Sequence, residues 1–160
     1  MATFKEQHQE LQHIVRELVL VRDHNLKFKA GDPQDKLLHF AEGLLVLLAL
    51  ERFLRAVLGS DANERHTLQN LLEMATSAKR NLLTIPGTGT REQAIKAIAE
   101  VRNTLMHGNY EQAATGAGSQ DVRAYFKSGQ YISEVEWLYK LLDELMKQID
   151  PATGKPRVKK

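Results

Sequence analysis

The sequence predicts an all-α protein, an up-and-down bundle of about five helices. Several long segments place apolar residues three and four positions apart, which is the spacing of one face of an α-helix. No segment keeps the apolar–polar alternation of a β-strand, and the breaks between the apolar segments are short. We assign residues 1–150 to one helical domain and residues 151–160 to a basic, flexible C-terminal tail.

The first two helices are predicted over residues 3–27 and 33–58. The inner face of the first is formed by apolar residues at helical spacing: Leu11, Ile14, Val15, Leu18 and Val21. Asp32 is a typical N-cap for the second helix, and Pro33 fits its first helical position. Gly59 comes directly after Leu58 and is a typical helix terminator.

Two capping-box pairs predict where the next helices begin. Asp61 and Glu64 form the first pair, ahead of a third helix with an apolar inner face of Leu68, Leu71, Leu72 and Ala75. Thr90 and Gln93 form the second pair, after the break IPGTGT. This pair predicts a fourth helix that ends near residue 107.

The last long helix is predicted over residues 133–149 and is followed by Pro151, which cannot continue it. Its inner face consists of Val135, Leu138, Leu141, Leu142, Leu145 and Ile149. Residues 121–130 could add a short helix, although Gly129 disfavours one. Trp137 and Tyr139 are expected in the core or on a dimer surface.

Composition excludes several classes of site. The chain has no cysteine, so it has no disulfide, no thiolate metal site and no cysteine nucleophile. The first ten residues lack the apolar segment of a secretory signal. The most apolar segment, within the second helix, is interrupted by charged residues and is too short to span a bilayer. We therefore expect a cytoplasmic protein without a membrane segment.

The basic charge is concentrated at one end of the chain. The tail contains Lys155, Arg157, Lys159 and Lys160 and no acidic residue, so the rest of the chain is at −2 against a formal total of +2. A slightly acidic body argues against broad, non-specific binding of nucleic acid. Any RNA site must therefore be local.

The segment VRNTLMHGNY, residues 101–110, carries the main candidate site. On the predicted fourth helix, Arg102 lies at the edge of an apolar face made by Ala94, Ile98, Val101 and Leu105. His107 is about 140° round the helix from Arg102 and is followed by Gly108, a typical terminator. Asn103 shares the face of His107 and can orient its imidazole. The spacing alone is also that of an ordinary helix C-terminus with a histidine near the dipole.

The residues RNTLMH resemble the R-N-x-x-x-H motif of HEPN domains, the helical bundles of RNA-cleaving toxins and antiviral effectors. In that family the motif also lies late in the bundle. The long apolar second helix, the motif on the fourth helix and a further helix after it are similar too. The likeness covers residues 3–149, and its specific part is Arg102, Asn103 and His107.

This resemblance implies a metal-independent endoribonuclease that needs no cofactor. The ribose 2′-hydroxyl attacks the adjacent phosphate, which leaves a 2′,3′-cyclic phosphate and a 5′-hydroxyl. His107 would move the proton, because histidine titrates near neutral pH. Arg102 would stabilise the charge on the phosphoryl oxygens, and Asn103 would hold or polarise the reacting groups.

The resemblance further implies RNA as the substrate and a homodimer as the active form. HEPN sites are built where two copies of the motif face each other, and this chain has one copy. A composite site also removes the need for Arg102 and His107 to converge on one helix. A toxin or a phage-defence effector is the implied biological role.

Tyr110 is a candidate for covalent modification by a nucleotidyltransferase-type antitoxin. In HEPN toxins of that kind a tyrosine follows the histidine as R-x4-H-x-Y. Here one further residue separates His107 from Tyr110, so the sequence departs from that pattern.

Two alternatives stay open beside the nuclease. The chain could be a non-catalytic HEPN-like module that binds a nucleotide or RNA, or a helical interaction protein in which Arg102 and His107 only cap and pair. Other motifs are weaker. The glycines of IPGTGTRE follow a helix rather than a strand and are more typical of a loop than of a phosphate cradle. The histidines of the first helix lack the spacing of a metal site.

Overall fold

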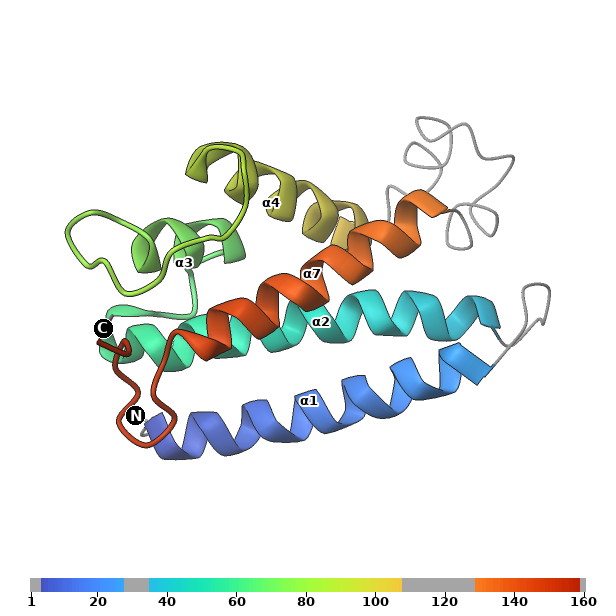
Figure 1. Cartoon of the computed structure of the whole chain (residues 1–160), viewed down its shortest axis with the longest axis horizontal. Coiled ribbons are helices and arrows are strands. Elements are labelled where there is room, and N and C mark those ends of the chain that lie inside the picture. The colour runs from blue at the N-terminus through green and yellow to red at the C-terminus, as the bar shows by residue number, and fades with distance from the viewer. Residues whose placement is uncertain (1–3, 28–34, 108–128, 159–160) are drawn as a thin grey trace.

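The computed structural model describes residues 4–27, 35–107 and 129–158, and it is all-helical (Figure 1). The described chain contains five α-helices: α1 (Phe4–Lys27), α2 (Asp35–Leu58), α3 (Leu68–Ala75), α4 (Arg91–His107) and α7 (Gly129–Lys147). A short 3₁₀ helix, η1 (Gly59–Asp61), extends α2, and no β-strand occurs within these residues. The predicted fold class is confirmed. The predicted N-cap Asp32 and Pro33 lie outside the described residues, as do Tyr110 and residues 121–128.

Helix α2 is the centre of the bundle. It packs against α1, α3, α4 and α7, and α1 forms an antiparallel hairpin with it (Figure 1). Helix α7 crosses α2 along the same direction, while α3 and α4 lie together above them in this view. A helix that is covered on several sides must be apolar on several sides. This explains why α2 is apolar around most of its circumference.

The core consists of the apolar faces that the spacing predicts. All six predicted inner residues of the last helix are buried, and so are the four predicted for α3. Helix α1 contributes Leu11 and Leu18, both fully buried, while Ile14 and Val15 are only partly covered. In the part of the chain that the structure describes, none of the helices has the length and apolar character needed to cross a bilayer.

Helix α3 begins with a different capping box from the predicted one. Thr67 is its N-cap, and the side chains and backbone amides of Thr67 and Asn70 bond reciprocally. The prediction that Asp61 and Glu64 form this cap is wrong. Asp61 instead ends η1 and pairs with Arg80, 3.2 Å from its Nε. Both pairs have the three-residue spacing of a capping box, and the fold of residues 62–67 decides which pair begins the helix.

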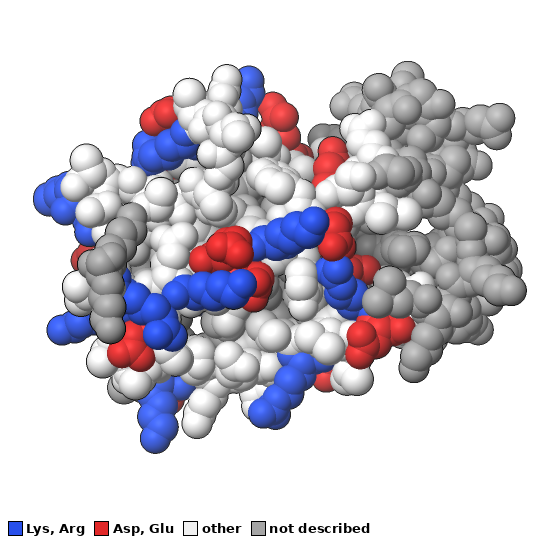
Figure 2. Space-filling model, in the orientation of Figure 1, with Lys and Arg blue, Asp and Glu red and all other residues white. Residues whose placement is uncertain are grey.

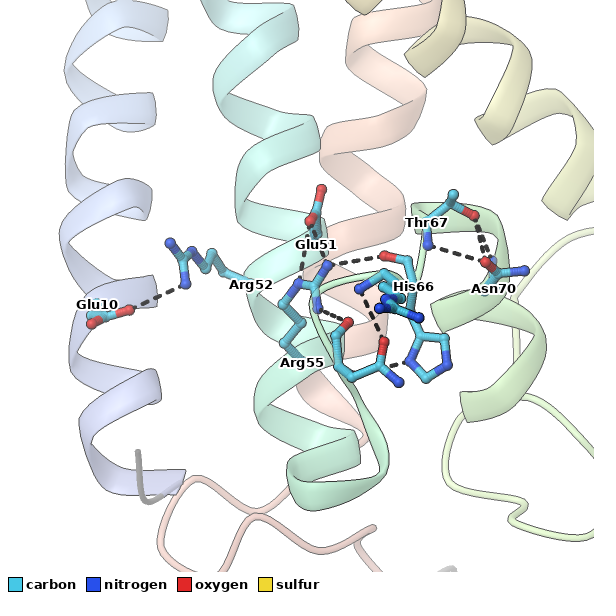
Figure 3. A network of polar contacts seen from close by, with 9 residues as sticks. Glu10, Glu51, Arg52, Arg55, His66, Thr67 and Asn70 are labelled. Atoms are coloured by element: carbon cyan, nitrogen blue, oxygen red, sulfur yellow. Dashed lines mark hydrogen bonds and ion pairs between the residues drawn. The ribbon is translucent and has the colours of Figure 1, made fainter. Parts of the chain in front are cut away.

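Arg55 of α2 holds the connection from η1 to α3 in place (Figure 3). Its guanidinium donates to the backbone carbonyls of Asn63 at 2.8 Å and His66 at 3.0 Å. It also donates to Glu51 one turn earlier on α2, at 3.0 Å. Arg52 points the other way, to Glu10 of α1, over 3.5 Å. The two neighbouring arginines at the end of α2 thus have different functions.

Replacing Arg55 by methionine is expected to destabilise the fold by about 1–3 kcal/mol, because two loop carbonyls lose a charged donor. Methionine keeps most of the apolar stem, so packing changes little. The same change at Arg52, which is about half exposed, is expected to cost less than about 0.5 kcal/mol. Urea unfolding of both variants measures the difference. Equal losses would contradict the role given to Arg55.

The C-terminal helix starts and ends earlier than predicted. It begins at Gly129, and its first turn includes Tyr131, which is buried. It ends at Lys147, where the Gln148 side chain bonds both backbone groups of Thr84, at 2.8 and 2.7 Å. These two bonds turn the chain out of the helix before Pro151.

Part of the tail predicted to be flexible is folded in the structure. The amide of Asp150 donates to the carbonyl of Lys155, and that of Arg157 donates to the carbonyl of Gln148. Ile149 and Pro156 form an isolated antiparallel bridge. Gly154, with φ +69°, lies against Phe4 of α1. Residues 148–157 therefore form a turn that folds back against α1.

Candidate functional site

Helix α4 carries the candidate motif and is capped as predicted. The Thr90 amide donates to Gln93 Oε1 at 3.0 Å, and the Gln93 amide donates to Thr90 Oγ1 at 3.2 Å. In the first turn, a backbone hydrogen bond and the neighbouring Arg91 lower the pKa of Glu92. The carboxylate therefore stays charged where the helix dipole favours a negative group. The helix is continuous from Arg91 to His107.

Arg102 lies at the centre of the inner face of α4, not at its edge. The buried residues of this helix lie within about 60° on either side of Arg102: Ile95, Ile98, Ala99 and Leu105. Ala94 and Val101, which the sequence places on the inner face, are only partly covered. The predicted face is thus rotated, because α3 and α2 both pack against α4 and together select the side that is buried.

The Arg102 side chain leaves one buried donor without a partner. Its Nε is buried and makes no hydrogen bond within the described structure. At the end of the side chain, Nη1 donates to Asn103 Oδ1 at 3.3 Å, on the surface. A buried N–H without an acceptor costs about 1–3 kcal/mol. The guanidinium is therefore held at the end of α4 with unused donors, as an anion-binding group would be.

His107 is the last residue of α4, and the structure describes its backbone only. The register of the helix sets position 107 about 140° from position 102 and about 7.5 Å further along the axis. Asn103 is exposed and shares the face of position 107. The structure thus brings Arg102 and Asn103 together and leaves position 107 on another side of the same helix.

Gly43 of α2 sets how closely the end of α4 approaches the bundle. An added Cβ at Gly43 would overlap the Tyr131 hydroxyl of α7 and lie 3.3 Å from the Leu105 side chain of α4. Three helices therefore meet at a position that admits no side chain. The sequence analysis missed Gly43, although a glycine inside a strongly apolar helix often indicates a close approach of this kind.

A polar cluster joins α1, α2 and α7 inside the bundle, and the sequence analysis did not single it out. Arg22 donates to both carboxylate oxygens of Glu136, at 2.9 and 2.7 Å, and lies 4.0 Å over the Tyr139 ring. The side-chain amide of Asn25 donates to the carboxylate of the buried Glu42 at 2.9 Å. Arg22 and Asn25 continue the inner face of α1 beyond Leu18 at helical spacing, which is the signal that could have found them. We assign the cluster to the packing of α7 against α1.

The other sequence candidates do not form a site in the described residues. The loop before α4 lines a cavity of about 460 Å³ together with Arg91. Each of the three guanidinium nitrogens of Arg91 already donates to a partner: Thr76, Glu92 or the Glu73 carbonyl. Among residues 4–27, 35–107 and 129–158 there is no group of three His, Asp or Glu that could hold a metal ion.

The fold and the site define an all-α bundle with an inward-facing arginine at the end of α4. Within this broad class the chain matches no family model, no curated protein and no solved structure. The likeness to HEPN domains therefore rests on the RNTLMH motif and the order of the helices.

Proposed function

We propose that this protein is a metal-independent endoribonuclease of the HEPN type, active as a homodimer, with Arg102, Asn103 and His107 in its site. The observation that carries the proposal is the placement of Arg102: its Nε is buried on the inner face of α4 with no acceptor among the described residues, and the end of its guanidinium reaches the surface beside Asn103. A buried polar atom without a partner costs about 1–3 kcal/mol; Arg22 Nη1 and Asn25 Oδ1 are in the same state, but only Arg102 belongs to the RNTLMH motif. The exposed end of the guanidinium can bind a phosphate group of RNA.

The reaction follows from the chemistry of these side chains. The ribose 2′-oxygen attacks the adjacent phosphorus and gives its proton to a neutral His107 imidazole. Arg102 stabilises the charge on the non-bridging oxygens as it builds up. The bond from phosphorus to the 5′-oxygen breaks, and that oxygen takes a proton from the protonated histidine of the second copy. The products are a 2′,3′-cyclic phosphate and a 5′-hydroxyl.

Two observations support a second copy at this end of the bundle. Positions 102 and 107 diverge by about 140° on one helix, so one copy cannot direct both at the same phosphate. Leu105 and Tyr131 pack at Gly43, and they are followed in the chain by Met106 and Ile132. Met106 and Ile132 are large apolar side chains, and more than two fifths of the surface of each is exposed. A dimer that covers them would bring two copies of α4 together.

Surface charge is consistent with a local site. Acidic and basic side chains are interspersed on the face that Figure 2 shows, over α1 and α7. Such a surface attracts RNA weakly through bulk charge. Recognition then depends on the end of α4.

The test is incubation of the purified protein with total RNA in excess EDTA. We expect cleavage that leaves 2′,3′-cyclic phosphate ends and that is lost in His107→Ala. Lys96→Ala, at an exposed position of the same helix, is the control and should cleave as the wild type does. Cleavage that needs added magnesium, or that persists in His107→Ala, would refute the proposal. Binding of RNA without cleavage would favour the non-catalytic module instead.

A further inference from the structure

A groove with a volume of about 560 Å³ lies between α1 and α7, with α2 beneath it. Its floor and walls are mainly apolar and include Val15, Leu18, Phe53, Leu142 and Met146. This volume and this lining are those of small-molecule sites in proteins. No described residue of α4 lines the groove, so its function is independent of the proposed RNA site.

Contacts between separate elements lie near both ends of the groove. At one end Arg22 bridges from α1 to Glu136 of α7 and covers the Tyr139 ring, which also lines the groove. At the other end Phe4 lines it, and Gly154 packs so closely on the Phe4 ring that no Cβ would fit between them. The α1 residues that line it extend from Phe4 to Leu18, about 21 Å of helix. A groove of this limited length suits a small linear molecule better than a long helix.

One basic side chain at an end of the groove is paired and another is not. Lys147 Nζ lies 2.8 Å from Asp143 Oδ2 and 3.5 Å from Glu144 Oε1, and these two carboxylates raise the pKa of Lys147. Arg157 also lines the groove, and its guanidinium makes no hydrogen bond or ion pair with the described residues. One planar cation next to an apolar groove is complementary to one carboxylate.

We propose that this groove binds a free, unbranched alkyl carboxylate. The carboxylate pairs with Arg157, beside the turn of residues 148–157. The alkyl chain lies along Val15, Leu18 and Leu142 toward Tyr139. Apolar burial supplies most of the affinity, and the single charge sets the orientation.

The experiment is calorimetric and NMR titration of the whole chain with octanoate, decanoate and dodecanoate. Each added pair of methylenes is expected to tighten binding about tenfold until the groove is full. Arg157→Gln is expected to weaken decanoate binding about tenfold and to leave the weaker binding of 1-decanol unchanged. Val15→Phe, which fills the groove, is expected to weaken both ligands at least tenfold.

Two matched controls separate the site from the surface. Arg65→Gln and Val19→Phe change an arginine and a valine that do not line the groove, and both variants should bind decanoate as the wild type does. The proposal is overturned if no saturable binding occurs below the micelle concentration, or if Val15→Phe binds decanoate normally. A dimer that Val15→Phe dissociates would overturn it as well, since a second copy would then occupy the groove.

Discussion

Replacing Arg102 by methionine is expected to abolish RNA cleavage while leaving the fold at least as stable as before. Methionine retains most of the buried stem and removes a buried Nε that has no acceptor among the residues described by the structure. The cleavage rate should fall by about 10³-fold, because the charge on the phosphoryl oxygens loses its cation. The free energy of unfolding should stay level or rise by about 1 kcal/mol, since the unpaired donor is gone.

Cleavage in EDTA and urea unfolding of the same preparation measure both effects. Lys96→Met, at an exposed position of α4, is the control and should change neither quantity. A loss of stability would contradict this prediction. If Arg102→Met unfolds more easily by about 1 kcal/mol or more, then Arg102 stabilises the bundle and the ordinary structural explanation of the motif is correct.

Gly43→Ala is expected to destabilise the protein by about 1–3 kcal/mol, against the usual direction of this substitution. Inside an exposed helix, alanine is more favourable than glycine by about 1 kcal/mol. At Gly43 the new Cβ overlaps the Tyr131 hydroxyl and comes within 3.2 Å of the ring carbon that bears it. Both atoms belong to a fully buried side chain, so the Tyr131 ring or one of the two helices must shift. The steric cost of the overlap is therefore larger than the gain in helix propensity from glycine to alanine.

A double-mutant cycle with Tyr131→Phe tests the cause. Removing the hydroxyl takes away the closest overlap, so the double variant should lose less stability than the two single losses added together. Cleavage should fall in Gly43→Ala as well, because Leu105 and the end of α4 pack at the same position. If the losses are additive, contact with Tyr131 is not the reason for the glycine.

The helices themselves were predictable because their signals are local. Leu138, Leu141, Leu142 and Leu145 repeat at helical spacing, and all four are buried. Thr90 and Gln93 lie three residues apart and need only each other to form their cap. The same logic failed for Asp61 and Glu64. Their pattern is as good as that of Thr67 and Asn70, but Arg55 bonds the carbonyls of the segment between the two pairs.

The candidate site was predictable in its residues and not in its geometry. The sequence by itself determined that Arg102 and His107 lie on one helix and diverge on it, because helical register depends only on spacing. Only the tertiary structure decided that Arg102 is central on the buried face, that Gly43 brings α4 and α7 together, and that an apolar groove lies between α1 and α7. These features depend on which neighbours cover each helix, and such contacts join residues far apart in the chain.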